Sequence, residues 1–235
     1  MVTNKKTRST LRVVWWTVLA TSILLFAAAP APAADTSGLI KDALDVLKEM
    51  AKQNDAGDMA KVIKGAESVA IVPSMVKAGL IIGGEYGEGL ILRKKGGKWY
   101  SPSFYNLGGG SVGLQVGVQK IAFVLVVNNE KGVDAFLKSR TKLGGDASVA
   151  AGPVGRRGEA ATDAQLKASI YSYSMTKGLF AGVSLEGSVI SVSVKRNKEY
   201  WKKDISADDA LKQPATDKRI LPLIREIDSI IQKAR

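Results

Sequence analysis

The fold is decided by residues 79–127, which read GLIIGGEYGEGLILRKKGGKWYSPSFYNLGGGSVGLQVGVQKIAFVLVV. Twelve glycines fall within residues 79–117, and the short segments between them alternate apolar with small residues. Residues 121–127 form a continuous apolar run, which is typical of a strand covered on both faces. Because glycine inside strands marks bulges, bends or closely approaching backbones, this stretch predicts a strongly curved, mostly antiparallel sheet.

Helices are expected on both sides of this stretch. Apolar residues recur at helical spacing over residues 37–53 and from about residue 216 onward. The fold class is therefore α+β: a curved glycine-rich sheet, with a barrel-like form as one outcome, flanked by N- and C-terminal helices. Weak repeats are compatible equally with two related halves and with chance similarity of glycine-rich sequence. Shorter helices are expected at 58–65 and 131–140, and further strands at 68–72, 147–151, 182–185 and 189–194.

The N-terminus has the layout of an export signal. Residues 13–29 are apolar or small, and Ala31-Pro32-Ala33 offers a cleavage site before Ala34. The segment predicts a signal peptide over residues 1–33 and a mature protein in a bacterial periplasm or cell envelope. An uncleaved membrane anchor is the alternative. Four basic residues precede the apolar run: Lys5, Lys6, Arg8 and Arg12.

Missing residue types exclude several kinds of chemistry. The chain contains no Cys and no His, which excludes disulfides, His-dependent catalytic triads and most zinc, copper and non-haem iron sites. We expect no cofactor and no metal. The 34 basic and 22 acidic residues give a net charge of +12, which suits an anionic partner. Export disfavours nucleic acid as that partner.

Two Ser-x-x-Lys sequences leave an enzymatic alternative open. Ser74–Lys77 and Ser174–Lys177 match, by letter, the nucleophile and base of penicillin-recognising enzymes, which carry the pair on a helix. The companion S-D-N and K-T-G motifs are absent, and Pro73 disfavours a helix at the first pair. The glycines at 108–113 match a dinucleotide-binding motif, but strand-like sequence follows where that motif needs a helix. We therefore expect no enzymatic activity.

Basic and aromatic residues alternate in two segments, around 93–105 and 195–203. Cations attract lipid phosphates, and amphipathic aromatic rings favour the headgroup layer. If the segments are neighbours, they form a basic face that binds anionic membrane lipids. The alternative is a solvated hairpin whose aromatic rings fold back onto the sheet. The candidate lipid-binding residues are Arg93, Lys94, Lys95, Lys98, Trp99, Tyr100, Lys195, Arg196, Trp201, Lys202 and Lys203, joined by Arg156 and Arg157.

An ordered set of motifs resembles the SYLF domain over residues 58–202. The motifs are Trp99-Tyr-Ser-Pro-Ser103, Gly113-Leu-Gln-Val-Gly117, Ala151-Gly-Pro-Val-Gly-Arg156, Ser172-Tyr-Ser174, Lys177-Gly-Leu-Phe-Ala-Gly-Val-Ser-Leu-Glu-Gly187, and Asn197 with Tyr200-Trp201. The resemblance implies binding of membrane phospholipids, in eukaryotes phosphoinositides, through a basic surface and an amphipathic N-terminal helix. Actin binding belongs to some members, and no catalytic residues are associated with the family.

The resemblance also suggests domain boundaries. A leader at 1–33 precedes an amphipathic helix at 34–57, a SYLF-like domain at 58–203 and a helical extension at 204–235. Arg156 and Lys177 match family positions, which adds Lys177 to the candidate lipid-binding residues. An envelope module that binds a protein partner is the second expectation for function, and a serine-lysine hydrolase is the third.

Overall fold

The computed structural model describes residues 35–53, 56–79, 82–112, 117–152, 167–181 and 183–233. The expected leader and the candidates Arg156 and Arg157 lie outside the described residues. The helices are α2 (Thr36–Met50), α3 (Ala56–Lys64), α4 (Glu130–Leu137), α7 (Val194–Trp201), α8 (Ala207–Ala210) and α9 (Leu221–Lys233). The strands are β1 (Ser68–Gly79), β2 (Ile82–Lys95), β3 (Lys98–Trp99), β4 (Ser103–Val112), β5 (Gly117–Val127), β6 (Thr141–Lys142), β7 (Val149–Ala151), β8 (Ile170–Thr176), β9 (Leu179–Ala181) and β10 (Val189–Val192).

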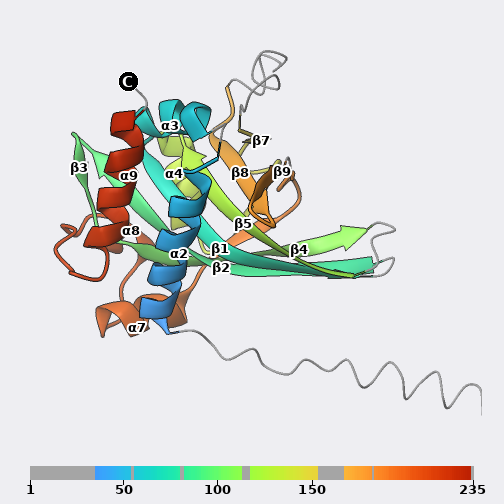
Figure 1. The fold of residues 1–235 in the computed structure, drawn as a ribbon. Coiled ribbons are helices and arrows are strands. Elements are labelled where there is room, and N and C mark those ends of the chain that lie inside the picture. Colours follow the sequence, from blue (N-terminus) through green and yellow to red (C-terminus); the bar gives the residue numbers. More distant parts are fainter. Residues whose placement is uncertain are drawn as a thin grey trace, which may run out of the picture. The chain divides into compact units, whose positions relative to one another are not determined.

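The strands form one curled sheet in the order β6-β10-β4-β2-β1-β5-β8-β7, with β3 added to β2 and β9 to β8. Within the described residues every strand pair is antiparallel except β7 with β8. Figure 1 shows α2 and α9 over one side of this sheet, and β1, β2, β4 and β5 projecting beyond the helices. The expected α+β class is confirmed, with the sheet curled into a half-barrel.

Apolar side chains are buried on both faces of the sheet. Along β5, Val124 and Val126 face a helix-side core formed with α2, α3 and α9. The alternate residues Phe123 and Leu125 face an inner core, which α4 closes with Phe136. The continuous apolar run at 121–127 is therefore explained by burial on both faces.

Strand β1 continues through Pro73, where the sequence predicted its end. The pairing of β1 with β2 shifts between Ile71 and Ser74, which is a bulge that accommodates the proline. Gly89 of β2 passes close beneath this bulge, because a Cβ atom added there would stand 2.5 Å from the carbonyl oxygen of Ile71. At this position glycine is required by the close approach of two backbones.

The N-terminal helix α2 has its apolar face inside the protein. The Asp35 side chain caps it by accepting a 2.6 Å hydrogen bond from the backbone N–H of Gly38. The apolar face is buried in the helix-side core, and its members are Leu39, Ile40, Ala43, Leu47 and Met50. Among the described helices, none is long and apolar enough to cross a membrane.

Helix α7 was not expected from the sequence. Seven of its eight residues, VKRNKEYW, are polar or charged or carry a polar tip, so no apolar periodicity marks it. Tertiary contacts hold it instead. The buried Asn197 side chain donates to the carbonyl oxygen of Phe104 and accepts from the Phe104 N–H, both at 3.0 Å. The C-terminal helix was expected from about residue 216, and α9 begins at Leu221.

Candidate functional site

The first basic segment forms the hairpin between β2 and β3. Lys95 pairs with Lys98 across the turn, and Gly96 and Gly97 take φ values of 57° and 75°. Glycine adopts positive φ values with little steric penalty because it has no Cβ atom. Lys95 and Lys98 are exposed and Lys94 is half-buried, so the turn carries three lysines at its end.

Two residues of this segment point inward. Arg93 is buried and binds the Glu130 carboxylate at 2.6 Å. The Trp99 indole N–H donates to Asp228 of α9 at 2.8 Å, and the ring packs against the helix-side core. The Lys94 ammonium lies 5.5 Å from the Trp99 ring centroid. The guanidinium is buried and the indole is half-buried, and both stabilise the hairpin through these contacts.

The second basic segment lies on and after α7, and it too has some side chains that point inward and others that are exposed. The Arg196 side chain is 3% exposed and binds Glu88 at 2.7 Å and Glu199 at 3.1 Å. Hydrogen bonding to Glu88 raises the pKa of Arg196, and a hydrogen bond from the Thr36 backbone lowers the pKa of Glu199. The Trp201 indole donates to the carbonyl oxygen of Pro102 at 3.3 Å. Arg196 and Trp201 are therefore committed to internal contacts.

The remaining candidates do not form one patch. Lys195, Lys202 and Lys203 are exposed around α7, and Lys177 is exposed in the β8–β9 turn with φ 52°. Figure 1 shows β3 and α7 well apart. Tyr100, half-buried, is paired with Pro214. The two segments therefore contact each other through Pro102 and Phe104, but the hairpin lysines at β3 and the exposed lysines of α7 do not form the single basic face that would follow from neighbouring segments.

Two further lysines are close in sequence to residues that contact the hairpin, and the sequence did not associate them with it. The Lys94 backbone N–H donates to the carbonyl oxygen of Glu67. Lys64 is three residues before Glu67 in the sequence. Lys131 follows Glu130, the partner of Arg93. None of these lysines forms an ion pair with a described carboxylate. We define the basic end as Lys64, Lys94, Lys95, Lys98 and Lys131.

The first Ser-x-x-Lys sequence lacks the geometry of a catalytic pair. Ser74 and Lys77 lie in β1, where Ser74 is opposite Glu88 and Lys77 is opposite Glu85. Three residues along a strand place side chains on opposite faces. Lys77 binds Glu85 at 2.7 Å. The glycines of the dinucleotide-like motif from Gly108 to Val112 lie in β4, as expected.

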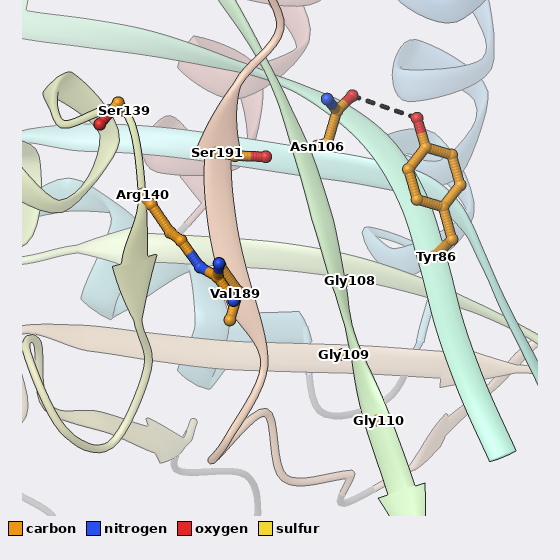
Figure 2. Close-up of a pocket in the computed structure, with 9 residues that line it drawn as sticks. All are labelled: Tyr86, Asn106, Gly108, Gly109, Gly110, Ser139, Arg140, Val189 and Ser191. Carbon is orange, nitrogen blue, oxygen red and sulfur yellow. Dashed lines mark hydrogen bonds between the residues drawn. The ribbon is translucent and has the colours of Figure 1, made fainter.

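A shallow groove of about 520 Å³ was not predicted from the sequence. Its lining includes Tyr86 of β2, the glycines of β4, Ser191 of β10 and Arg140 from the segment before β6 (Figure 2). The sequence signal that could have indicated this groove is Tyr86, an aromatic residue in a glycine-rich strand segment. Arg140 gave none, because only the pairing of β10 with both β4 and β6 brings it near.

Comparison with known proteins identifies the family. The model described as "Ysc84: Las17-binding protein actin regulator" matches residues 108–230. An SH3 domain-containing protein of Schizosaccharomyces pombe is 40% identical over 175 residues, 72% of this chain and 40% of that protein. Protein YSC84 of Saccharomyces cerevisiae is 36% identical over 203 residues, 80% of this chain and 42% of that protein. The SH3 domain-containing YSC84-like protein 1 of Homo sapiens is 36% identical over 154 residues, 65% of this chain and 45% of that protein.

The chain therefore spans less than half the length of these relatives. The family model covers more than half of the chain and overlaps the motifs that resemble the SYLF domain. The chain belongs to the Ysc84 family, whose shared module is the SYLF domain.

Proposed function

We propose that the chain is a non-enzymatic module that binds anionic phospholipid membranes through the basic end. The observation that carries this proposal is the hairpin between β2 and β3, which presents Lys94, Lys95 and Lys98 with no described ion-pair partner, while Lys64 and Lys131 belong to segments that contact the hairpin strand. A cation near an anionic membrane surface contributes about 1 kcal/mol. The acids nearest these lysines include Glu67, Glu130, Asp134 and Asp228; Glu130 is neutralised by Arg93, and Asp228 accepts the hydrogen bond from Trp99.

The basic end is better suited to this contact than α7. Around α7, Lys198 is paired with Asp204 at 2.9 Å, and Arg196 is paired with two carboxylates. Fewer free cations remain there, and they are interspersed with acids. The exposed turn at Gly96 and Gly97 also allows Lys95 and Lys98 to approach a flat surface without obstruction.

The contact is electrostatic and does not depend on insertion of aromatic rings. The indoles of Trp99 and Trp201 donate to internal acceptors, and the apolar face of α2 is buried. Binding that depends on surface charge weakens as salt shortens the screening length. We also propose that residues 1–33 direct export, which would make the membrane one of the cell envelope.

The proposal is tested by co-sedimentation of the full chain with phosphatidylcholine vesicles, with and without phosphatidylglycerol. Binding is expected only with phosphatidylglycerol and should fall with salt. The triple substitution Lys94→Glu, Lys95→Glu and Lys98→Glu removes three contributions of about 1 kcal/mol each, which lowers affinity roughly a hundredfold. Equal binding to both kinds of vesicle would refute the proposal.

A matched control changes the same charge at α7. The triple substitution Lys195→Glu, Lys202→Glu and Lys203→Glu alters net charge by the same amount at a different place. It should weaken binding much less than the hairpin triple. Equal losses in the two triples would show that net charge, and not the basic end, determines binding.

The comparisons favour a second candidate function, which is binding of a protein partner. One relative carries the name LAS seventeen-binding protein 3, and the matching family model is described as an actin regulator. In this candidate the same exposed lysines would bind an acidic protein surface. Capture of one defined protein by the full chain, with no retention on phosphatidylglycerol vesicles, would favour it over membrane binding.

A further inference from the structure

The groove beside Tyr86 is built by neighbouring strands in a fixed register. Tyr86 of β2 lies opposite Gly108 of β4, which lies opposite Val189 of β10. One row along, Asn106 lies opposite Ser191. Residues in these rows share one face of the sheet, because residues two apart on a strand point the same way. This face carries a ring, an amide and a hydroxyl around a floor of glycine.

The glycine floor leaves room for a flat ligand. A Cβ atom added to Gly110 would meet no heavy atom within 4 Å. From β2 to β10 the floor spans two strand spacings, about 10 Å. The volume of about 520 Å³ falls in the range of small-ligand sites, roughly 300–1,000 Å³. Figure 2 shows Tyr86 and Arg140 on opposite sides of the glycines of β4.

The polar groups of the groove are partly held in place and partly free. The Tyr86 hydroxyl donates to Asn106 Oδ1 at 3.3 Å and contacts Glu88 at 3.4 Å, which fixes the ring. The amide nitrogen of Asn106 and the hydroxyl of Ser191 have no hydrogen-bond partner among the described residues. These groups suit the hydroxyls of a ligand.

Arg140 gives the groove a positive charge. It is exposed, and it forms no ion pair with any carboxylate in the described part of the chain. Glu88 lies on the same face but is already bound by Arg196 at 2.7 Å. A guanidinium presents two parallel N–H groups that match a carboxylate, so the free Arg140 favours an anionic ligand.

We propose that this groove binds a sugar ring that carries a carboxylate, as in a uronic acid. The ring lies over Gly108 and Gly110 beside Tyr86. Its hydroxyls accept from Asn106 and exchange hydrogen bonds with Ser191, and its carboxylate binds Arg140. The groove shares no residue with the basic end, so this inference goes beyond the proposed membrane binding and does not depend on it.

The test is ligand-observed NMR titration of the full chain with three matched probes: D-glucuronate, D-glucose and D-glucose 6-phosphate. D-glucuronate is expected to bind about tenfold more tightly than D-glucose, because its carboxylate forms charge-assisted hydrogen bonds with Arg140 that D-glucose cannot form. Equal affinity for these two probes would overturn the proposal. Tighter binding of D-glucose 6-phosphate would also overturn it, in favour of a phosphate site.

Three variants separate the groove from the rest of the surface. Arg140→Gln should abolish the preference for D-glucuronate, and Gly110→Val should block every probe by filling the floor without altering charge. Arg225→Gln, on the exposed face of α9, is the matched control and should bind like the parent. Unchanged D-glucuronate binding in either groove variant would refute the assignment. Vesicle binding should survive Arg140→Gln, so the two proposals can fail separately.

Discussion

Replacing Gly89 by alanine tests the packing that lets β1 bulge over β2. A Cβ atom at this position would stand 2.5 Å from the Ile71 carbonyl oxygen, 2.7 Å from Tyr105 Cζ and 2.8 Å from the Tyr105 hydroxyl. Neither neighbour can move cheaply. Ile71 contributes backbone at the bulge, and the buried Tyr105 ring packs edge-on against Phe136 with centroids 4.9 Å apart.

The expected effect of Gly89→Ala is a large loss of stability. Overpacking a well-packed interior costs about 1–3 kcal/mol, and two simultaneous clashes place this substitution at about 3 kcal/mol or more. For a domain of this size each kcal/mol lowers Tm by roughly 2–4 °C, which gives a decrease of about 6–12 °C. Thermal unfolding followed by circular dichroism measures the shift, and urea unfolding measures the free energy.

Gly84→Ala is the matched control on the same strand. The nearest atom to an added Cβ atom is the Gly109 carbonyl oxygen at 4.0 Å, which is ordinary contact. Alanine inside a strand is favoured over glycine by about 0.5–1 kcal/mol, so this variant should be slightly more stable than the parent. If Gly89→Ala were as stable as Gly84→Ala, the close approach at the bulge would be refuted.

Three further outcomes are expected. Arg196→Met removes the cation shared by the partly exposed carboxylates of Glu88 and Glu199. Urea unfolding should show that the free energy of unfolding falls by about 2–3 kcal/mol. A change within error would contradict a stabilising role for these two ion pairs. A hydrogen bond from Arg219 lowers the pKa of Asp217 to about 2, from 3.8. That interaction stabilises the fold above pH 3.8 and is lost as pH falls toward 2. Because solvent screens this partly exposed pair, Asp217→Asn should remove about 1 kcal/mol or less of this pH dependence, and an unaltered stability curve would argue against it. Intact mass of the protein from expressing cells should place the mature N-terminus at Ala34; a chain that retains residues 1–33 would support the anchor alternative.

The parts of the fold that were predicted depend on local sequence. The glycine-rich stretch, the apolar run at 121–127 and the helical spacing at 37–53 each carry a periodicity or composition that one segment shows by itself. The course of β1 through Pro73 could not be predicted in this way. It depends on Gly89, which belongs to another strand and has no signal in the sequence around the proline.

The candidate site shows the same division. Sequence identified the basic hairpin, but it treated Arg196 and Lys195 alike, although one is buried between carboxylates and the other is exposed. The difference arises from how α7 is rotated against the sheet, which Asn197 fixes through the backbone of Phe104. The groove at Tyr86 could not be predicted, because it is formed by the pairing of four strands and no local sequence pattern indicates which strands pair.

The burial of α2 limits how this protein could use an amphipathic helix. Four large side chains, Leu39, Ile40, Leu47 and Met50, are at most 6% exposed, and exposing each to water on release of the helix costs about 1.5–3 kcal/mol. Release would thus cost roughly 6–12 kcal/mol, which is comparable with the total stability of an ordinary domain, about 5–15 kcal/mol. A bilayer that extracted α2 would cover the helix again but would leave the helix-side core of the sheet, α3 and α9 exposed to water, so docking that preserves the fold must use the surface as it stands.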